Sequence, residues 1–293
     1  MYENRQSTGI AGLDEKLGGG LVNGTMTVLI GSSGIGKTQF GIQYANAGLN
    51  QEGLRGIIFD MASRIDPQGH KEYAQRICNW ILKEESLEKR FEHEKFFDNN
   101  KTVCDYFHPL QYQGKRVTKR DLDFEQWNDW NAELSKNLES TIAFFFRHFT
   151  NGVRRFVVDG IEPVQHQGES IQFELLEYIY HQIIRKDAEW VARDLFRQNY
   201  FIYQEIIAKH LYRKEDVGCL VCYTTPETSL DAMIEKTLDE GDLLASANTI
   251  IYMGKIRDGV KFKRGIYVAK HRSCKCPDEI LLYDIDDKGI FLL

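Results

Sequence analysis

One eight-residue segment constrains this chain more than any other. Residues 31–38 read Gly-Ser-Ser-Gly-Ile-Gly-Lys-Thr and match the pattern G-x-x-x-x-G-K-S/T at every fixed position. The preceding residues 25–30 are β-branched and apolar, which predicts a buried strand, and residues 39–45 can continue as a helix. The strand, the glycine-rich loop and the helix follow one another in the order that the motif requires.

Such a loop predicts a phosphate-binding site. Glycines let consecutive backbone N–H groups point into one concavity, and the helix N-terminus adds its positive end. We expect Lys37 to reach terminal phosphates and the Thr38 hydroxyl to ligate Mg²⁺. A glycine-rich turn that binds nothing is the alternative, and both flanking elements argue against it. The predicted ligand-binding residues are Gly31, Ser32, Ser33, Gly34, Ile35, Gly36, Lys37 and Thr38.

Short apolar runs after the loop predict a sheet with helices between its strands. Apolar residues spaced by three and four from Phe124 to Phe149 predict a helix that buries one face. The pattern indicates an α/β fold: a mostly parallel central sheet, helices on both faces and an antiparallel C-terminal margin. We expect a single domain over 1–293, with helical insertions around 65–152 and 161–217. The predicted strands are 56–60, 153–159, 218–224, 249–253, 265–270 and 280–285.

Asp159 closes one of these predicted strands. In a protein with a phosphate-binding loop, an aspartate at the carboxyl end of a buried strand is the expected second Mg²⁺ ligand, holding the ion through water. The alternative is an aspartate that only starts a turn before Gly160. We therefore predict that Thr38 and Asp159 form the metal site.

Charge and cysteine content exclude several classes of protein. The net charge of −6 gives no global attraction to nucleic acid, although a local basic loop would escape this argument. The sequence has neither a membrane-spanning apolar run nor a secretory signal, which predicts a cytoplasmic protein. Its six cysteines are expected to be thiols. Cys219 and Cys222 would face opposite sides of a strand, which argues against a shared metal, and Cys274-x-Cys276 lies near the C-terminal cationic segment.

The two ends of the chain resemble a known family. Residues 7–20, Ser-Thr-Gly-Ile-Ala-Gly-Leu-Asp-Glu-Lys-Leu-Gly-Gly-Gly, followed by the loop, are similar to the entry sequence of KaiC-like ATPases of the RecA superfamily. The segment Lys-His-Arg-Ser at 270–273 is similar to the lysine-x-arginine segment of that family. Residues 283–290 are similar to its closing isoleucine-x-aspartate-x-glycine-isoleucine turn.

The resemblance implies a homo-oligomeric ring, commonly hexameric, with ATP and Mg²⁺ held between neighbours. Lys270 and Arg272 match the residues that reach the γ-phosphate on the adjacent subunit, and a guanidinium supplied in this way can stabilise the charge of the transition state. Asp287, in the closing turn, becomes a predicted nucleotide contact. The alternative for Lys270 and Arg272 is a pair of cations on a solvated loop.

The chain also departs from the family pattern. The strand after the loop helix tends to end in a glutamate pair in that family, and the alignment puts Ala62 and Ser63 at those positions. Asp60 can replace the glutamates only if its strand ends one or two residues earlier than predicted, and Glu162 is a weaker candidate for the general base. The predicted catalytic set is therefore Lys37, Asp60, Lys270 and Arg272.

Three functions remain compatible with these patterns. The first is an ATP-hydrolysing ring that acts as a switch or motor component for a protein partner. The partner would bind through the helical insertions, and the segment 173–203 is either such an interface or two helices that cover the sheet. The second is an ATP-dependent scaffold that does not hydrolyse. The third is a RecA/RadA-type DNA repair or recombination ATPase, which the acidic balance disfavours.

Overall fold

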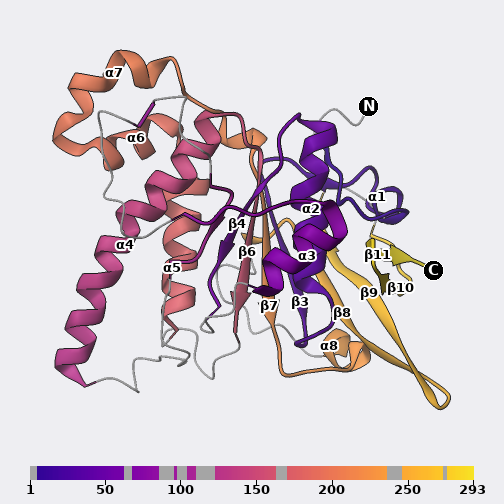
Figure 1. Ribbon diagram of the computed structural model, residues 1–293. Coiled ribbons are helices and arrows are strands. Elements are labelled where there is room, and N and C mark those ends of the chain that lie inside the picture. The colour runs from indigo at the N-terminus through magenta and orange to yellow at the C-terminus, as the bar shows by residue number, and fades with distance from the viewer. Residues whose placement is uncertain are drawn as a thin grey trace.

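A nine-stranded sheet with helices on both faces forms the body of the protein in a computed structural model (Figure 1). The structure describes residues 5–62, 68–85, 96–97, 104–109, 123–162, 170–235, 246–272 and 276–293. The strands lie in the order β11-β10-β9-β8-β3-β7-β6-β4-β5, so the strand that leads into the glycine-rich loop 31–38 occupies the centre. The predicted fold class is confirmed.

Six neighbouring strands of this sheet are parallel. Their bounds are β3 (Met26–Gly31), β4 (Ile57–Asp60), β5 (Tyr106–Phe107), β6 (Arg155–Ile161), β7 (Gly218–Thr224) and β8 (Thr249–Asp258). Three antiparallel strands complete the margin: β9 (Lys261–His271), β10 (Leu281–Asp286) and β11 (Gly289–Leu292). A separate antiparallel pair is formed by β1 (Arg5–Gln6) and β2 (Leu21–Val22).

Helices cover the two faces unequally. One face carries α1 (Leu13–Lys16), α2 (Lys37–Gln51) and α3 (Gln68–Cys78). The other carries α4 (Phe124–Thr150), α5 (Ile171–Ile179), α6 (Ala188–Phe196), α7 (Tyr200–Ala208) and α8 (Leu230–Glu235). A π-helical turn at Tyr180–Ile184 and 3-10 turns at Arg197–Asn199 and Lys214–Asp216 join these elements. Within the described ranges no helix combines the length and the apolar character that crossing a bilayer requires.

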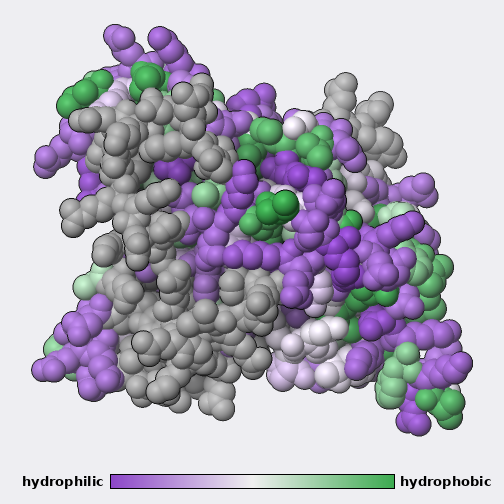
Figure 2. Space-filling model, in the orientation of Figure 1, coloured by the Kyte–Doolittle hydropathy of each residue, from purple (hydrophilic) through white to green (hydrophobic). Residues whose placement is uncertain are grey.

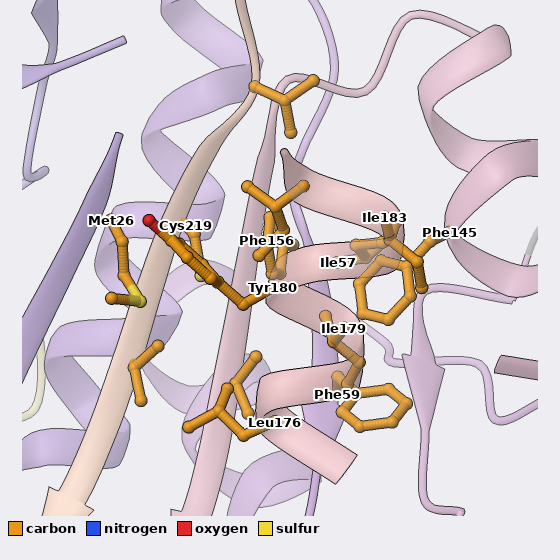
Figure 3. Packing of buried hydrophobic residues seen from close by; sticks show 14 of the residues in the cluster. Met26, Ile57, Phe59, Phe145, Phe156, Leu176, Ile179, Tyr180, Ile183 and Cys219 are labelled. Atoms are coloured by element: carbon orange, nitrogen blue, oxygen red, sulfur yellow. The ribbon is translucent and has the colours of Figure 1, made fainter. Parts of the chain in front are cut away.

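The alternation of side chains along each strand divides the core into two clusters. Val28 faces α4, α5 and α6, whereas its neighbour Leu29 faces α1, α2 and α3. Phe59, Phe145 and Phe156 pack together in the first cluster, as Figure 3 shows from close by. A strand buried on both sides needs an apolar residue at nearly every position, which explains the continuous apolar runs in the sequence.

Several boundaries differ from the predictions. β6 begins at Arg155 rather than at residue 153, and it continues past Asp159 to Ile161 with a register shift between Val158 and Ile161. Phe124, the first residue of the predicted buried stripe, is 77% exposed in the first turn of α4. The first insertion contains the strand β5 as well as helices.

Within the segment 173–203, the helices α5 and α7 differ in how far they are buried. α5 covers the sheet, because Leu176 and Ile179 are fully buried in the core. α7 instead exposes Phe201 and Ile202, and Figure 2 shows apolar side chains gathered over this helix at the upper left. The packing role is therefore confirmed for α5, and a role in partner binding remains a prediction for α7.

Candidate functional site

The loop between β3 and α2 has the backbone shape that its glycines predict. Gly34 and Gly36 have φ angles of +75° and +115°, in the region that favours glycine. Gly36 is the N-cap of α2 and offers no side-chain hydrogen bond, which leaves the first N–H groups of the helix to other acceptors. Gly31 lies so close to β8 that an added Cβ would stand 2.4 Å from the Met253 carbonyl oxygen.

Lys37 is the first residue of α2 and its side chain is buried. Its ammonium group donates hydrogen bonds to the carbonyl oxygens of Gly31 and Ser32, both at 2.8 Å. Burial lowers the pKa of Lys37, while the nearby Cys222 and Asp159 act in the opposite direction. The ammonium therefore lies inside the loop, on acceptors that a phosphate can replace.

Thr38 and Asp159 lie together, as predicted. The Thr38 hydroxyl donates to Asp159 Oδ2 at 2.6 Å, and Asp159 Oδ1 accepts the N–H of Gly160 at 2.8 Å. Burial alone would raise the pKa of Asp159, but hydrogen bonds from His70 and Thr38 and the positive charge of His70 lower it. A hydroxyl beside an ionised carboxylate is a donor set that suits Mg²⁺.

His70 joins this site although no motif identified it. The third residue of α3, it places Nε2 at 2.9 Å from Asp159 Oδ2 and Nδ1 at 3.3 Å from Asp60 Oδ2. Burial alone would lower the pKa of His70, but the two carboxylates outweigh burial and raise it to about 9. Its one sequence signal is its place on the inner stripe of α3 with Tyr73, Ala74 and Ile77, at helical spacing.

Asp60 ends β4, and its Cα is paired with that of Asp159 on β6. Its Oδ2 accepts the hydroxyl of Tyr106 at 2.5 Å, and its Oδ1 accepts the N–H of Ala62 at 2.8 Å. The strand ends where the sequence predicted and not earlier, yet the side chain is linked to Asp159 through His70. Ser63, the other position in the family alignment, lies outside the described residues.

Five side chains thus form one hydrogen-bonded group across the strand ends, which we call the strand-end cluster. Its members are Thr38, Asp60, His70, Tyr106 and Asp159. Each of the four carboxylate oxygens already accepts at least one hydrogen bond.

Glu162, the weaker candidate for the general base, is held at its backbone. Its N–H donates to Gln172 Oε1 at 3.0 Å. The amide nitrogen of Gln172 donates to the carbonyl oxygens of Met61 and Gly160, at 2.5 and 2.9 Å. Gln172, which the sequence did not single out, therefore ties the ends of β4 and β6 together from α5.

Lys270 and Arg272 lie at the opposite end of the strands from the loop. β9 is antiparallel to β8, and His271 is paired with Thr249 at the amino-terminal end of β8. Gly31 is paired with Met253, so the two positions are separated by about 13 Å along the sheet at 3.3 Å per residue. The buried His271 points inward between them, whereas Lys270 is half-buried and Arg272 exposed.

Asp287 lies in the turn between β10 and β11, close to α3. Its carboxylate accepts from Arg76 at 3.3 Å and is otherwise exposed. The same hairpin supports the loop, because the Tyr283 hydroxyl donates to the Ile35 carbonyl at 2.7 Å and Gln43 bonds the Ile290 backbone. The turn therefore stands beside the N-terminal part of α2.

The cysteines behave as the strand geometry predicts. Cys219 belongs to the core cluster on one face of the sheet and Cys222 to the cluster on the other. Burial raises the pKa of both thiols well above the usual range. The five described cysteines are free thiols, whereas Cys274 lies outside the described residues. No group of three metal-binding side chains is found in the described part of the chain.

Comparisons with known proteins show which proteins this chain is similar to. A family model for the KaiC ATPase matches residues 6–102, a third of the chain that includes the loop, α2 and β4. This part of the chain is therefore similar to the KaiC ATPase family, and the predicted resemblance is confirmed.

Two individual proteins are similar to this chain. The circadian clock protein KaiC2 of Synechocystis sp. (strain ATCC 27184 / PCC 6803 / Kazusa) is 32% identical over 99 residues, which are 31% of this chain and only 16% of that protein. The KaiC-like protein PH0186 from Pyrococcus horikoshii OT3 has a similar structure, with a TM-score of 0.53 over 99% of this chain and 98% of that one. At 15% identity, this second likeness shows the fold alone.

Proposed function

We propose that this chain is a Mg²⁺-dependent ATPase of the KaiC type that binds ATP on the loop 31–38. The hydrogen bond from Thr38 to Asp159 carries the proposal, because it joins two residues 121 positions apart at the point where a metal-bound phosphate chain would end. Mg²⁺ prefers one or two protein oxygens together with phosphates and water. Thr38 and Asp159 would hold the ion, which would neutralise charge on the terminal phosphates.

Lys37 and the loop amides would bind the phosphates. The Lys37 ammonium now donates to two neutral carbonyl oxygens. Anionic phosphate oxygens are stronger acceptors, so the ammonium would exchange one or both of these bonds on binding. The N–H groups at the start of α2 supply the positive end of a fifteen-residue helix to the same ligand.

Asp60 is the carboxylate best placed to act as the general base. It ends the strand adjacent to β6, and His70 links it to the carboxylate proposed to hold the metal. A base must lie within hydrogen-bond reach of the attacking water, and Tyr106 and Ala62 fix the direction in which this carboxylate faces. Activation of the water requires one of these partners to give way.

The positions of Lys270 and Arg272 favour a site completed by a neighbour. They lie at the end of the strands that is opposite the chain's own loop. A β-bulge between the partners of Ile250 and Ile251 precedes Lys270, and such bulges reorient side chains at functional edges. We infer that a second copy of the chain brings these cations to the phosphates, in a homo-oligomeric ring.

A non-hydrolysing, ATP-dependent scaffold is the second candidate. One observation favours it: Asp60 is 2% exposed and each of its oxygens already accepts a hydrogen bond, which restricts the access of a water molecule to this carboxylate. In that case ATP would order the assembly without being consumed.

The decisive experiment measures Mg²⁺-dependent ATP turnover as a function of protein concentration. Lys37→Ala serves as the blank, and Lys209→Ala, an exposed lysine at the end of α7, serves as the matched control. Turnover per subunit that rises steeply with concentration, vanishes in Lys37→Ala and persists in Lys209→Ala supports the ring ATPase. Binding of ATP with turnover at the level of the blank favours the scaffold.

A separate experiment tests the proposed role of Arg272. Arg272→Ala should retain ATP binding and lose most turnover, because its guanidinium would act only on the neighbour's transition state. Equal turnover in wild type and Arg272→Ala would refute the contribution in trans. ATP that fails to bind to wild type at all would refute both proposed functions.

A further inference from the structure

His70 occupies an unusual place in the strand-end cluster. It enters from α3, and its ring lies between the ends of the neighbouring strands β4 and β6 with 8% of its surface exposed. The ring also packs on Tyr106, with the centroids 5.6 Å apart. A side chain so enclosed is held in place by its neighbours from three elements.

Both nitrogens of this ring face carboxylate oxygens. Nε2 lies 2.9 Å from Asp159 Oδ2, and Nδ1 lies 3.3 Å from Asp60 Oδ2. An ionised carboxylate only accepts hydrogen bonds, so both ring nitrogens meet acceptors. His70 thereby joins the carboxylate of the proposed metal site to the carboxylate of the proposed base.

The contact with Asp159 competes with the proposed metal. Asp159 Oδ2 accepts from the Thr38 hydroxyl at 2.6 Å as well as from His70. Two donors use the lone pairs of that oxygen, and its partner Oδ1 already accepts the Gly160 N–H. A metal ion held by Thr38 and Asp159 together, directly or through water, would lie on the Oδ2 side of the carboxylate, where Thr38 and His70 already donate.

We propose that His70 is a positioning residue that holds Asp60 and Asp159 together, and that it yields its contact with Asp159 when a metal-bound nucleotide enters the loop. This inference rests on the proposed function. Released on the Nε2 side, the ring keeps Asp60 as its partner at Nδ1 and continues to orient that carboxylate. His70 thus couples occupation of the metal site to the position of the base.

Two opposite effects follow from removing the ring. Without His70, Asp159 no longer has to exchange a partner, so Mg²⁺ should strengthen nucleotide binding more than it does in wild type. The expected gain is roughly ten- to hundredfold, the equivalent of one hydrogen bond to a charged group. Turnover should fall at the same time, because Asp60 loses the residue that orients it.

The test is a calorimetric titration with ADP, in EDTA and in excess Mg²⁺, on wild type, His70→Ala and His70→Gln. The matched control is His108→Ala, which removes a neighbouring imidazole that is 4% exposed and bonded to the Ala62 carbonyl at 2.8 Å. Affinity in EDTA, and its loss in Lys37→Ala, tests the proposed function. The Mg²⁺ ratio, which is the ADP affinity in excess Mg²⁺ divided by the ADP affinity in EDTA, tests the role of His70.

We expect the Mg²⁺ ratio to rise in His70→Ala, to rise less in His70→Gln, which keeps one donor, and to stay unchanged in His108→Ala. An unchanged or reduced ratio in both His70 variants would overturn the inference while leaving the proposed function intact. Absence of ADP binding in wild type would overturn both.

A second measurement does not depend on a variant that folds. In wild type labelled with ¹⁵N-histidine, the His70 side-chain resonances should shift when ADP is added with Mg²⁺ but not when ADP is added in EDTA, and those of His108 should stay in place. Identical His70 spectra under the two conditions would contradict the exchange of partners.

Discussion

The aromatic layer beneath α4 and the strand-end cluster are built on the same two strands, β4 and β6. The layer consists of Phe59, Phe144, Phe145, Phe149 and Phe156, whose neighbouring ring centroids lie 5.2–5.7 Å apart. Phe59 and Asp60 are consecutive residues, yet the first belongs to the layer and the second to the cluster. Both regions exclude water, one through apolar contact and the other through hydrogen bonds that satisfy every carboxylate oxygen.

Two buried histidines show what this difference means. His148 on α4 packs on Phe144, 4.4 Å between centroids, and its Nδ1 donates to the Phe144 carbonyl oxygen at 2.7 Å. Burial lowers the pKa of His148 to about 4, whereas the carboxylates around His70 raise the pKa of that residue to about 9. Burial by itself therefore does not decide the charge of a histidine; its partners do.

The comparison predicts that the aromatic layer contributes to the stability of the fold and not to ADP binding. Phe145→Ala removes the ring that contacts Phe59, Phe144, Phe149 and Phe156, and it should lower the free energy of unfolding by about 3–5 kcal/mol. Denaturant titration measures this loss, and ADP affinity of the remaining folded protein should not change. Phe201→Ala, at a position 77% exposed, is the control and should stay within ~0.5 kcal/mol. A loss below that of Phe201→Ala would contradict the layer's role.

A pH titration of stability tests the comparison at His148, which packs on the aromatic layer. The folded pKa of His148 is about 4, below the unfolded value of 6.5, so its contribution to stability is present above pH 6.5 and is lost as the pH falls toward 4. The full loss is about 3 kcal/mol, at 1.36 kcal/mol per pH unit. His148→Gln should remove this dependence, so the difference in stability between wild type and variant should be flat above pH 6.5 and fall below it. A difference that stays flat to pH 4 would exclude a neutral His148.

In the strand-end cluster, substitution should affect binding instead. Asp159→Asn keeps the shape of the side chain and removes its charge, so the affinity for ADP in Mg²⁺ should drop by roughly ten- to hundredfold. Affinity measured in EDTA should change less, because the loop amides and Lys37 remain. Equal losses under the two conditions would show that Asp159 does not act through the metal.

The smallest effect is expected at Tyr106 of the strand-end cluster. Tyr106 belongs to the apolar core, yet its hydroxyl donates to Asp60. Tyr106→Phe should cost about 1 kcal/mol of stability, since His70 continues to partner the same oxygen. Turnover should also fall, by more than the small loss of folded protein explains. The turnover rate is measured alongside denaturant unfolding, and an unchanged rate would show that Tyr106 does not orient Asp60.

Local patterns accounted for a large part of the fold and some of the site. The loop 31–38 is a contiguous motif, the strands alternate at a period of two, and Cys219 and Cys222 lie on opposite faces as that period requires. Boundaries were less certain: β6 begins at Arg155, and Phe124 is exposed, because the ends of elements depend on what packs against them. The KaiC resemblance rested on segments at the two ends of the chain.

The sequence by itself determined the glycine-rich loop between a strand and a helix, the nature of the sheet and the candidates Lys37, Thr38 and Asp159, because each depends on residues adjacent in the chain or on a short period. Only the tertiary structure decided that His70 lies between two carboxylates and that Lys270 lies at the other end of the strands from the chain's own loop. The physical reason is that these relations follow from the order and register of strands far apart in sequence. Nothing in the spacing of residues along the chain encodes which helix delivers a side chain to the ends of β4 and β6.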